Sequence, residues 1–216
     1  MLTFRVLAAL LAYPETKLIA SLDEAAAIIE SEGLLPPRQR APLLALIERL
    51  RAEDLLDSQE RYVALFDRRR SLSLHLYEHV HGESRDRGQA MVRLAQLYRF
   101  HGLEIAAREL PDYLPLFVEF LSILPIAPAR RLLAEPLPIV AAISSKLHEA
   151  GSPYAAIFDA LQAIAGGAPA EVIEIPADNA DLEALDREWE EEEVSFLGAG
   201  VGGCSPARPA TAARRS

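Results

Sequence analysis

The sequence has a single cysteine, Cys204, in 216 residues. One cysteine excludes an intrachain disulfide and a zinc cluster built from several thiolates, and it agrees with a reducing compartment. No apolar run approaches the roughly eighteen residues that suggest a membrane-spanning helix. Arg5 followed by VLAALLAY imitates a signal peptide, but Pro14-Glu15 follows it without a small-residue cleavage site. We therefore expect a buried first helix in a cytoplasmic protein with no integral membrane segment.

An excess of basic residues is also missing. The formal net charge is −10, from 22 Lys+Arg and 32 Asp+Glu. The acidic excess is concentrated between Glu171 and Glu193, where Arg187 is the only basic residue, and the rest of the chain is balanced. Without a basic field to attract a phosphate backbone, nucleic acid is not an expected partner.

Composition and charge together predict one domain and a tail. Hydrophobic residues make up 50% of the chain, enough to fill a core of ordinary size. We assign residues 1–170 to this domain and residues 171–216 to a flexible tail, first acidic and then rich in Gly, Pro, Ala and Arg. Trp189 in the acidic stretch leaves two interpretations open, an anchor that docks on the domain or an exposed contact for a basic partner.

Strand signals are almost absent, and the dominant hydrophobic period is helical. One helical pattern runs from Leu18 to Ile29 and ends at Gly33, and another continues from Leu55 to Phe66. Further helix starts are indicated by a proline or a capping residue at Pro42, Ser84, Asp112 and Ser152. The sequence therefore predicts an all-α, single-domain helical bundle of about eight or nine helices.

One segment departs from this period. Leu72, Leu74 and Leu76 alternate with polar residues, as in a half-buried strand. A lone strand in a helical bundle has no neighbour to pair with. We expect an extended or irregular linker between two helices, with its leucines anchored on the bundle.

The same segment contains His75-Leu76-Tyr77-Glu78-His79, which spells the zinc signature H-x-x-E-H. A small metal-dependent hydrolase would use His75 and His79 as ligands and Glu78 as general base, and His81 could add a third ligand. That chemistry requires a helix that contains both ligands, and the leucine alternation argues against one. The favoured interpretation is that these histidines are hydrogen-bonded and partly buried.

Charges of both signs surround this motif and interleave with apolar residues. Two interpretations stay open for them. They form either a salt-bridged loop that locks two helices together, or the rim of an apolar groove that receives an amphipathic helix of a partner.

Two stretches of the sequence resemble a known family. YVALFDRRRSLSLHLYEHVHGESRDRGQAMVRL at 62–94 and ELPDYLPLFVEFL at 109–121 are similar to the molybdenum-cofactor assembly chaperones of respiratory nitrate reductases (NarJ/NarW type). LLAYPE at 10–15 resembles the opening helix of that family, and the resemblance covers residues 4–165. The wider TorD/DmsD superfamily of redox-enzyme maturation chaperones commonly has Pro-Asp-His where this chain has Pro111-Asp112-Tyr113.

The resemblance implies an all-helical, TorD-like protein of the cytoplasm without catalytic residues, metal or cofactor. Its implied partner is the apo catalytic subunit of a nitrate reductase, bound at its N-terminal segment, with molybdenum cofactor biosynthesis proteins as further partners. Binding would keep the subunit competent for cofactor and iron-sulfur insertion before membrane attachment, and the chaperone would be absent from the finished enzyme. The candidate client-binding residues, taken from the matching motifs, are Tyr62, Phe66, Asp67, Arg70, Leu74, Glu78, His79, Arg85, Asp86 and Asp112.

Overall fold

The computed structural model describes residues 1–81, 85–105, 109–167, 173 and 175, without the side chains of His81 and Arg85. Several sequence predictions therefore lie outside the described residues: the cap at Ser84, the side chain of His81, the acidic stretch with Trp189, and most of the tail. The chain divides into two units, Met1–Asp178 and Asn179–Ser216, and all the described residues belong to the first.

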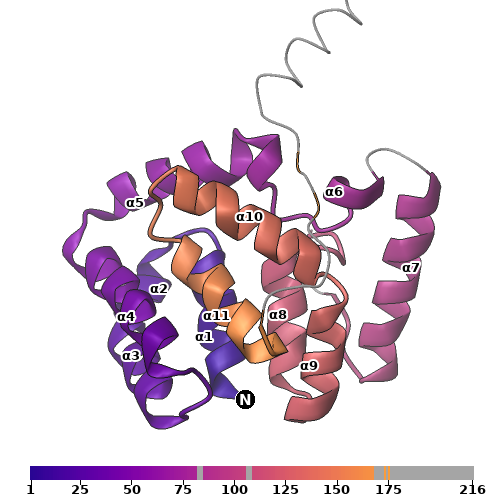
Figure 1. Cartoon of the computed structure of the whole chain (residues 1–216), viewed down its shortest axis with the longest axis horizontal. Helices are drawn as coiled ribbons and strands as arrows, with labels where there is room; N and C mark the ends of the chain where they lie inside the picture. Colours follow the sequence, from indigo (N-terminus) through magenta and orange to yellow (C-terminus); the bar gives the residue numbers. More distant parts are fainter. Residues whose placement is uncertain (82–84, 106–108, 168–172, 174, 176–216) are drawn as a thin grey trace, which may run out of the picture. The chain divides into compact units, whose positions relative to one another are not determined.

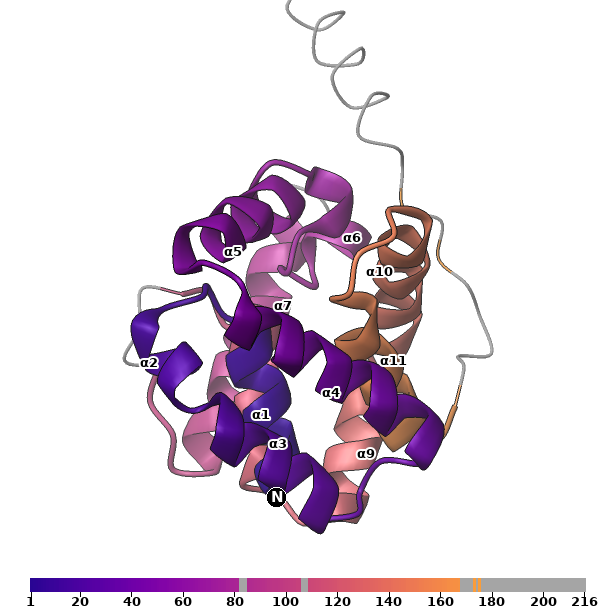
Figure 2. The same ribbon diagram turned by 90° about the vertical axis from the view of Figure 1, so that its left-hand side faces the viewer.

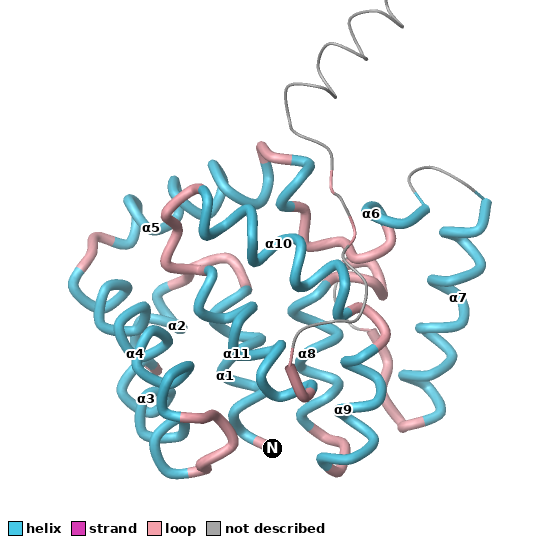
Figure 3. The backbone as a smooth tube through the Cα atoms, viewed as in Figure 1, coloured by secondary structure: helices cyan, strands magenta, loops and turns pink. Residues whose placement is uncertain are grey.

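The regular elements of the described residues are all helical, and the extended segments between them form one isolated β-bridge (Figure 3). They are α1 (Leu2–Leu11), α2 (Thr16–Ala20), α3 (Leu22–Ser31), α4 (Pro37–Ala52), α5 (Leu55–Tyr62), the π-helix η1 (Val63–Asp67), the 3₁₀-helix η2 (Arg70–Leu72), α6 (Glu78–His81), α7 (Arg85–Phe100), α8 (Leu114–Ser122), α9 (Ile126–Ala134), α10 (Leu137–Glu149) and α11 (Ala155–Ala165). The all-α prediction is confirmed. The eleven α-helices of the described residues exceed the expected eight or nine, partly because the pattern between Leu18 and Ile29 breaks at Ser21 into two helices.

The first helix lies at the centre of the bundle. Helix α1 packs against α3, α8 and α11, and the two views in Figures 1 and 2 show these helices around it. Phe4, Leu7 and Leu11 are fully buried, so the expectation of a buried first helix is confirmed. The backbone N–H groups of Leu2 and Thr3 donate to the Glu32 carboxylate, which supplies the acceptors that the start of α1 needs.

Two predicted helix starts were wrong. Helix α4 begins at Pro37, not at Pro42, which lies in its interior on the exposed side. Pro42 lies beyond the first turn, so the Arg38 carbonyl lacks its intrahelical donor, and Arg38 and Pro42 are both exposed to solvent. Helix α11 begins at Ala155 after a turn in which the Ser152 hydroxyl accepts from the Tyr154 N–H, so Ser152 closes a local turn and does not cap the helix.

The last described residues extend past the expected domain boundary. Helix α11 ends at Gly166, whose φ of 115° places it in the left-handed region that favours glycine. Beyond it, Ile173 and Ile175 are partly buried against the core. Within the described ranges, no helix has both the length and the apolar character needed to cross a membrane.

Candidate functional site

The candidate site is built where two loop segments pair. The Leu76 N–H donates to the Asp112 carbonyl at 3.1 Å, and the Leu114 N–H donates to the Leu74 carbonyl at 2.8 Å, which forms a bridge between His75 and Tyr113. The three alternating leucines, Leu72, Leu74 and Leu76, are at most 3% exposed. The prediction of an extended or irregular linker anchored by its leucines is confirmed: Leu72 ends the 3₁₀-helix η2, and the segment after it pairs minimally with the segment before α8.

A hollow with a volume of about 290 Å³ opens beside this bridge. Its walls come from the end of α1, from η1, and from the two paired segments. The lining residues, which we call the Tyr113 pocket, are Tyr13, Tyr62, Phe66, Asp67, Leu74, His75, Glu109 and Tyr113. Four of the ten candidates from the sequence, Tyr62, Phe66, Asp67 and Leu74, therefore lie together around one hollow.

The floor of the Tyr113 pocket is aromatic. The Tyr62 hydroxyl donates to the Leu11 carbonyl at 2.8 Å and lies 3.1 Å from the Tyr113 hydroxyl. The ring of Phe66 packs at 5.0 Å from Tyr62 and edge-on at 5.3 Å from Tyr154. Burial raises the pKa of Tyr62, so its hydroxyl stays a neutral donor. These contacts fix the rings in place, and the hydroxyl groups of Tyr62 and Tyr113 lie side by side at the pocket.

Asp112 lies beneath the bridge and is fully buried. Its carboxylate accepts from the Tyr77 N–H at 3.1 Å, lies 3.3 Å from His75 Nδ1, and lies 3.9 Å from Arg87 Nη2. Burial alone would raise the pKa of Asp112, but the hydrogen bonds from His75 and Tyr77 outweigh it and lower the pKa. The predicted role of Asp112 as the cap of α8 was wrong: the cap position is Tyr113, and the paired loop directs the Asp112 carboxylate to the linker.

The polar network continues through Ser73. The Ser73 hydroxyl donates to Glu78, which also accepts from Arg87 Nη2 at 3.2 Å. His79 Nε2 lies 2.8 Å from the Ser73 carbonyl, and burial lowers the pKa of His79. A neutral His79 therefore donates its Nε2–H to that carbonyl. We call Ser73, His75, Glu78, His79, Arg87 and Asp112 the Asp112 network.

This network uses the groups of the H-x-x-E-H motif for structural contacts. Helix α6 begins at Glu78, so His75 lies outside it and does not share a helical face with His79. His75 pairs with Asp112, and the hydrogen bond between them raises the pKa of His75 although burial opposes this. The residues that the structure describes contain no group of three His, Cys, Asp or Glu arranged to hold a metal ion. The helical arrangement that the zinc signature requires is not formed here.

The remaining sequence candidates do not join the pocket. Arg70 and Asp86 are exposed and line no part of it, and for Arg85 only the backbone is described, at the start of α7. Sequence reasoning missed Tyr13 and Glu109, and it did not place His75 among the client-binding candidates. Tyr13 precedes a buried proline and Glu109 lies two residues before Pro111, which are weak local signals. Their proximity to the pocket depends on tertiary packing.

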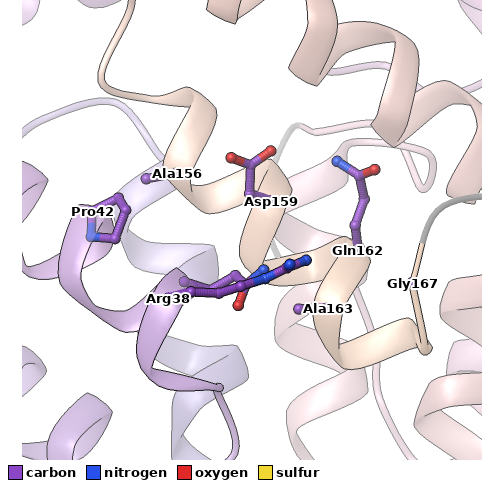
Figure 4. Close-up of a pocket in the computed structure, with 8 residues that line it drawn as sticks. Arg38, Pro42, Ala156, Asp159, Gln162, Ala163 and Gly167 are labelled. Atoms are coloured by element: carbon purple, nitrogen blue, oxygen red, sulfur yellow. The ribbon is translucent and has the colours of Figure 1, made fainter.

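A separate hollow lies between α4 and α11, and its lining includes Arg38 and Gln162 (Figure 4). Asp159 on its wall accepts from the Ser144 hydroxyl at 2.6 Å and lies 2.9 Å from His148 Nε2. Serine and histidine therefore both bind the carboxylate and do not bind each other. Nucleophilic catalysis needs a hydrogen bond between the histidine and the serine hydroxyl. These three residues therefore have the composition of a hydrolase triad without its geometry.

The helical fold places the chain in the class of all-α proteins, and the comparisons define the family. The family model described as "Nitrate reductase delta subunit" matches residues 32–160. The chain is 42% identical over 202 residues to the nitrate reductase molybdenum cofactor assembly chaperone NarJ of Escherichia coli (strain K12), covering 91% of this chain and 86% of the relative. The chain belongs to the nitrate reductase delta subunit family.

Two further relatives agree with this assignment. The probable chaperone NarW of Escherichia coli (strain K12) is 40% identical over 199 residues, which cover 89% of this chain and 83% of the relative. The probable NarJ of Bacillus subtilis (strain 168) is 32% identical over 162 residues, which cover 75% of this chain and 87% of the relative. The resemblance drawn from residues 62–94 and 109–121 is therefore confirmed.

Proposed function

We propose that this chain is a cytoplasmic, non-enzymatic chaperone for the assembly of a respiratory nitrate reductase. It binds the apo catalytic subunit at its N-terminal segment and keeps that subunit competent for insertion of the molybdenum cofactor and iron-sulfur clusters. The observation that carries the proposal is the Tyr113 pocket, because four residues chosen from the family motifs surround one hollow. The relatives named as chaperones of this kind support the assignment of nitrate reductase as the client.

The Tyr113 pocket has the character that an amphipathic helix requires. Tyr13 and Tyr113 present partly exposed aromatic rings, and the exposed carboxylates of Asp67 and Glu109 lie at its edge. Helix-in-groove recognition combines apolar anchors of the ligand with charged flanks that choose the partner. One or two large side chains of the client segment would enter the hollow, with its polar groups facing Asp67 and Glu109.

Chaperone action needs only a difference in affinity between two client states. A segment that is free in the apo subunit is bound, and the same segment buried in the mature subunit is not. Release after cofactor insertion then follows without energy input from the chaperone, which is absent from the finished enzyme. The proteins that make the molybdenum cofactor are the expected second class of partner.

The test is calorimetric titration with a synthetic peptide of about 20 residues, enough for a helix of about 30 Å, from the start of the cognate catalytic subunit. We expect saturable binding to the full chain between pH 5 and pH 8, where histidines titrate. A Tyr113→Ala variant removes one wall of the hollow and is expected to weaken binding about tenfold or more.

The matched control is Val92→Ser on α7, since Val92 is 58% exposed and lines no part of the pocket. This variant should bind as wild type does. Absence of binding at every pH in this range, or equal binding by the Tyr113→Ala variant, would refute the proposal.

A further inference from the structure

A second hollow adjoins the Tyr113 pocket. Its volume is about 650 Å³, larger than that of the first, and Tyr13 lines both. We call this second hollow the α5 pocket. Apart from Tyr13, its lining residues come from the face of α5 and the segment that follows it. None of the ten candidates taken from the sequence lines the α5 pocket.

The π-helix η1 connects the two hollows. It continues α5 for five residues, and its wide turn is closed by the Arg68 N–H on the Val63 carbonyl at 3.1 Å. Val63 and Ala64 line the α5 pocket, and Phe66 and Asp67 line the Tyr113 pocket. Single π-helical turns are rare and occur frequently at functional sites. Here one such turn supplies walls to both hollows.

The α5 pocket also exposes apolar side chains. Leu56 is 60% exposed and Tyr13 is 44% exposed, although large apolar side chains of this bundle are mostly buried. The ring of Tyr13 stands edge-on to Tyr62 at 5.6 Å, which holds it between the two hollows. Two adjacent exposed apolar side chains beside a hollow are typical of a surface that a partner covers.

The charges around both hollows that have no ion pair among the described residues are mostly negative. The α5 pocket has Asp57 and Glu60, and the Tyr113 pocket has Asp67 and Glu109. None of these four carboxylates forms an ion pair with a residue that the structure describes. Of the arginines that line the pockets, Arg61 is bound to Glu53, and Arg68 alone remains without such a pair among the described residues.

We propose that the α5 pocket is a second anchor site for the same client segment, which spans both pockets as a basic amphipathic helix. The inference rests on the proposed function, because it assigns the occupant of the Tyr113 pocket to the adjoining one. Tyr13 contacts the segment between its two sets of apolar anchors, and lysine or arginine side chains of the segment face the four free carboxylates. The α5 pocket thereby selects clients by length and by positive charge.

The test uses the same peptide and three pairs of titrations. Leu56→Ser should weaken binding about fivefold, since an exposed side chain loses only part of its apolar contact, while the Val92→Ser control stays unchanged. The double variant Asp57→Lys with Glu60→Lys should weaken binding about tenfold at low salt and less as salt screens the charges. Its control, Glu24→Lys with Glu30→Lys on exposed positions of α3, should bind as wild type does.

A peptide shortened to the half that fills the Tyr113 pocket completes the design. It should bind more weakly than the full peptide and be insensitive to Leu56→Ser. The inference is overturned if both α5-pocket variants bind the full peptide as wild type does; loss of binding in Tyr113→Ala alone would then leave the proposed function standing. If the wild-type chain binds neither peptide, the proposed function and this inference fall together.

Discussion

Residues 62–74 and residues 75–87 are neighbours in the chain, but their charged side chains differ in whether they form ion pairs within the fold. In the first stretch, Asp67 is exposed at a hollow and has no ion pair among the described residues. In the second, Glu78 and Arg87 bind each other, and His75 binds the buried Asp112. A charged side chain that is paired within the fold stabilises the structure. A charged side chain left unpaired beside a hollow is free to bind a partner.

This comparison divides the two interpretations that the sequence left open. The Asp112 network forms the salt-bridged loop, and the Tyr113 pocket is the proposed groove, with His75 belonging to both. Substitutions in the network should therefore change the free energy of unfolding, and substitutions at the exposed edge of the pocket should change client binding.

The largest effect is expected for Asp112→Ala. The fully buried carboxylate holds the Tyr77 N–H and His75 and faces Arg87, so its removal leaves buried donors without an acceptor. We expect a loss of about 3 kcal/mol in the free energy of unfolding, measured by urea titration followed by circular dichroism. Asp112→Asn keeps the shape and one acceptor and should lose about half as much. Wild-type stability in the Asp112→Ala variant would contradict the structural role of the network.

Tyr62→Phe is expected to have the next largest effect, because Tyr62 belongs to the pocket and is also tied to the core. Its hydroxyl donates to the Leu11 carbonyl near the end of α1, and the substitution removes that bond from a buried site. The free energy of unfolding should fall by about 1–1.5 kcal/mol in the same urea titration. Tyr13→Phe is the matched control, since Tyr13 is 44% exposed, and its stability should change by less than about 0.5 kcal/mol. Equal losses in both variants would contradict this assignment.

The pairing of His75 with Asp112 should make stability depend on pH. The pKa of His75 is raised above its usual 6.5, so its contribution is complete below that pH and is lost as the pH rises through the raised value. The pKa of Asp112 is lowered below its usual 3.8, so its contribution is present above that pH and is lost as the pH falls through the lowered value. The pair contributes most between these limits, near pH 5.

Urea titrations of wild type and His75→Gln at pH 5 and pH 9 measure this dependence. The free energy of unfolding of wild type should exceed that of His75→Gln, and this excess should be about 1 kcal/mol larger at pH 5 than at pH 9. His101→Gln is the control, because His101 is exposed and has no carboxylate partner among the described residues. A His75→Gln difference that does not change with pH would show that the ion pair contributes nothing.

The sequence predicted the helices better than it predicted the roles of particular polar residues. Hydrophobic spacing is a local property, so the pattern from Leu18 to Ile29 was found, and Leu22 and Ile29 are buried on α3. The role of Asp112 was not, because a capping residue and a residue that holds a distant loop look alike until the partner loop is placed. For the H-x-x-E-H motif the local leucine alternation was enough to argue against a helix through His75, and α6 begins only at Glu78.

Half of the residues that line the Tyr113 pocket could be predicted from the sequence. Tyr62, Phe66, Asp67 and Leu74 lie within one stretch that carries the family resemblance, so motif matching selected them together. Tyr13 and Glu109 come from the end of α1 and the approach to α8, and only the packing of α1 on α8 brings them near η1. The α5 pocket had no sequence signal, because the π-helical turn after Tyr62 has no distinctive composition.

The smallest expected effect on stability gives the sharpest test of the comparison. Asp67 and Asp86 are both exposed aspartates that the family motifs selected, but only Asp67 lines the Tyr113 pocket. Asp67→Asn and Asp86→Asn should each change the free energy of unfolding by less than about 0.5 kcal/mol. In calorimetric titrations with the client peptide at low salt, Asp67→Asn should weaken binding about threefold and Asp86→Asn should not, because one rim charge makes a modest contribution that salt screens. Equal weakening by the two substitutions would mean that binding responds to the net charge of the chain and not to the pocket, and the separation between recognising and stabilising charges would be lost.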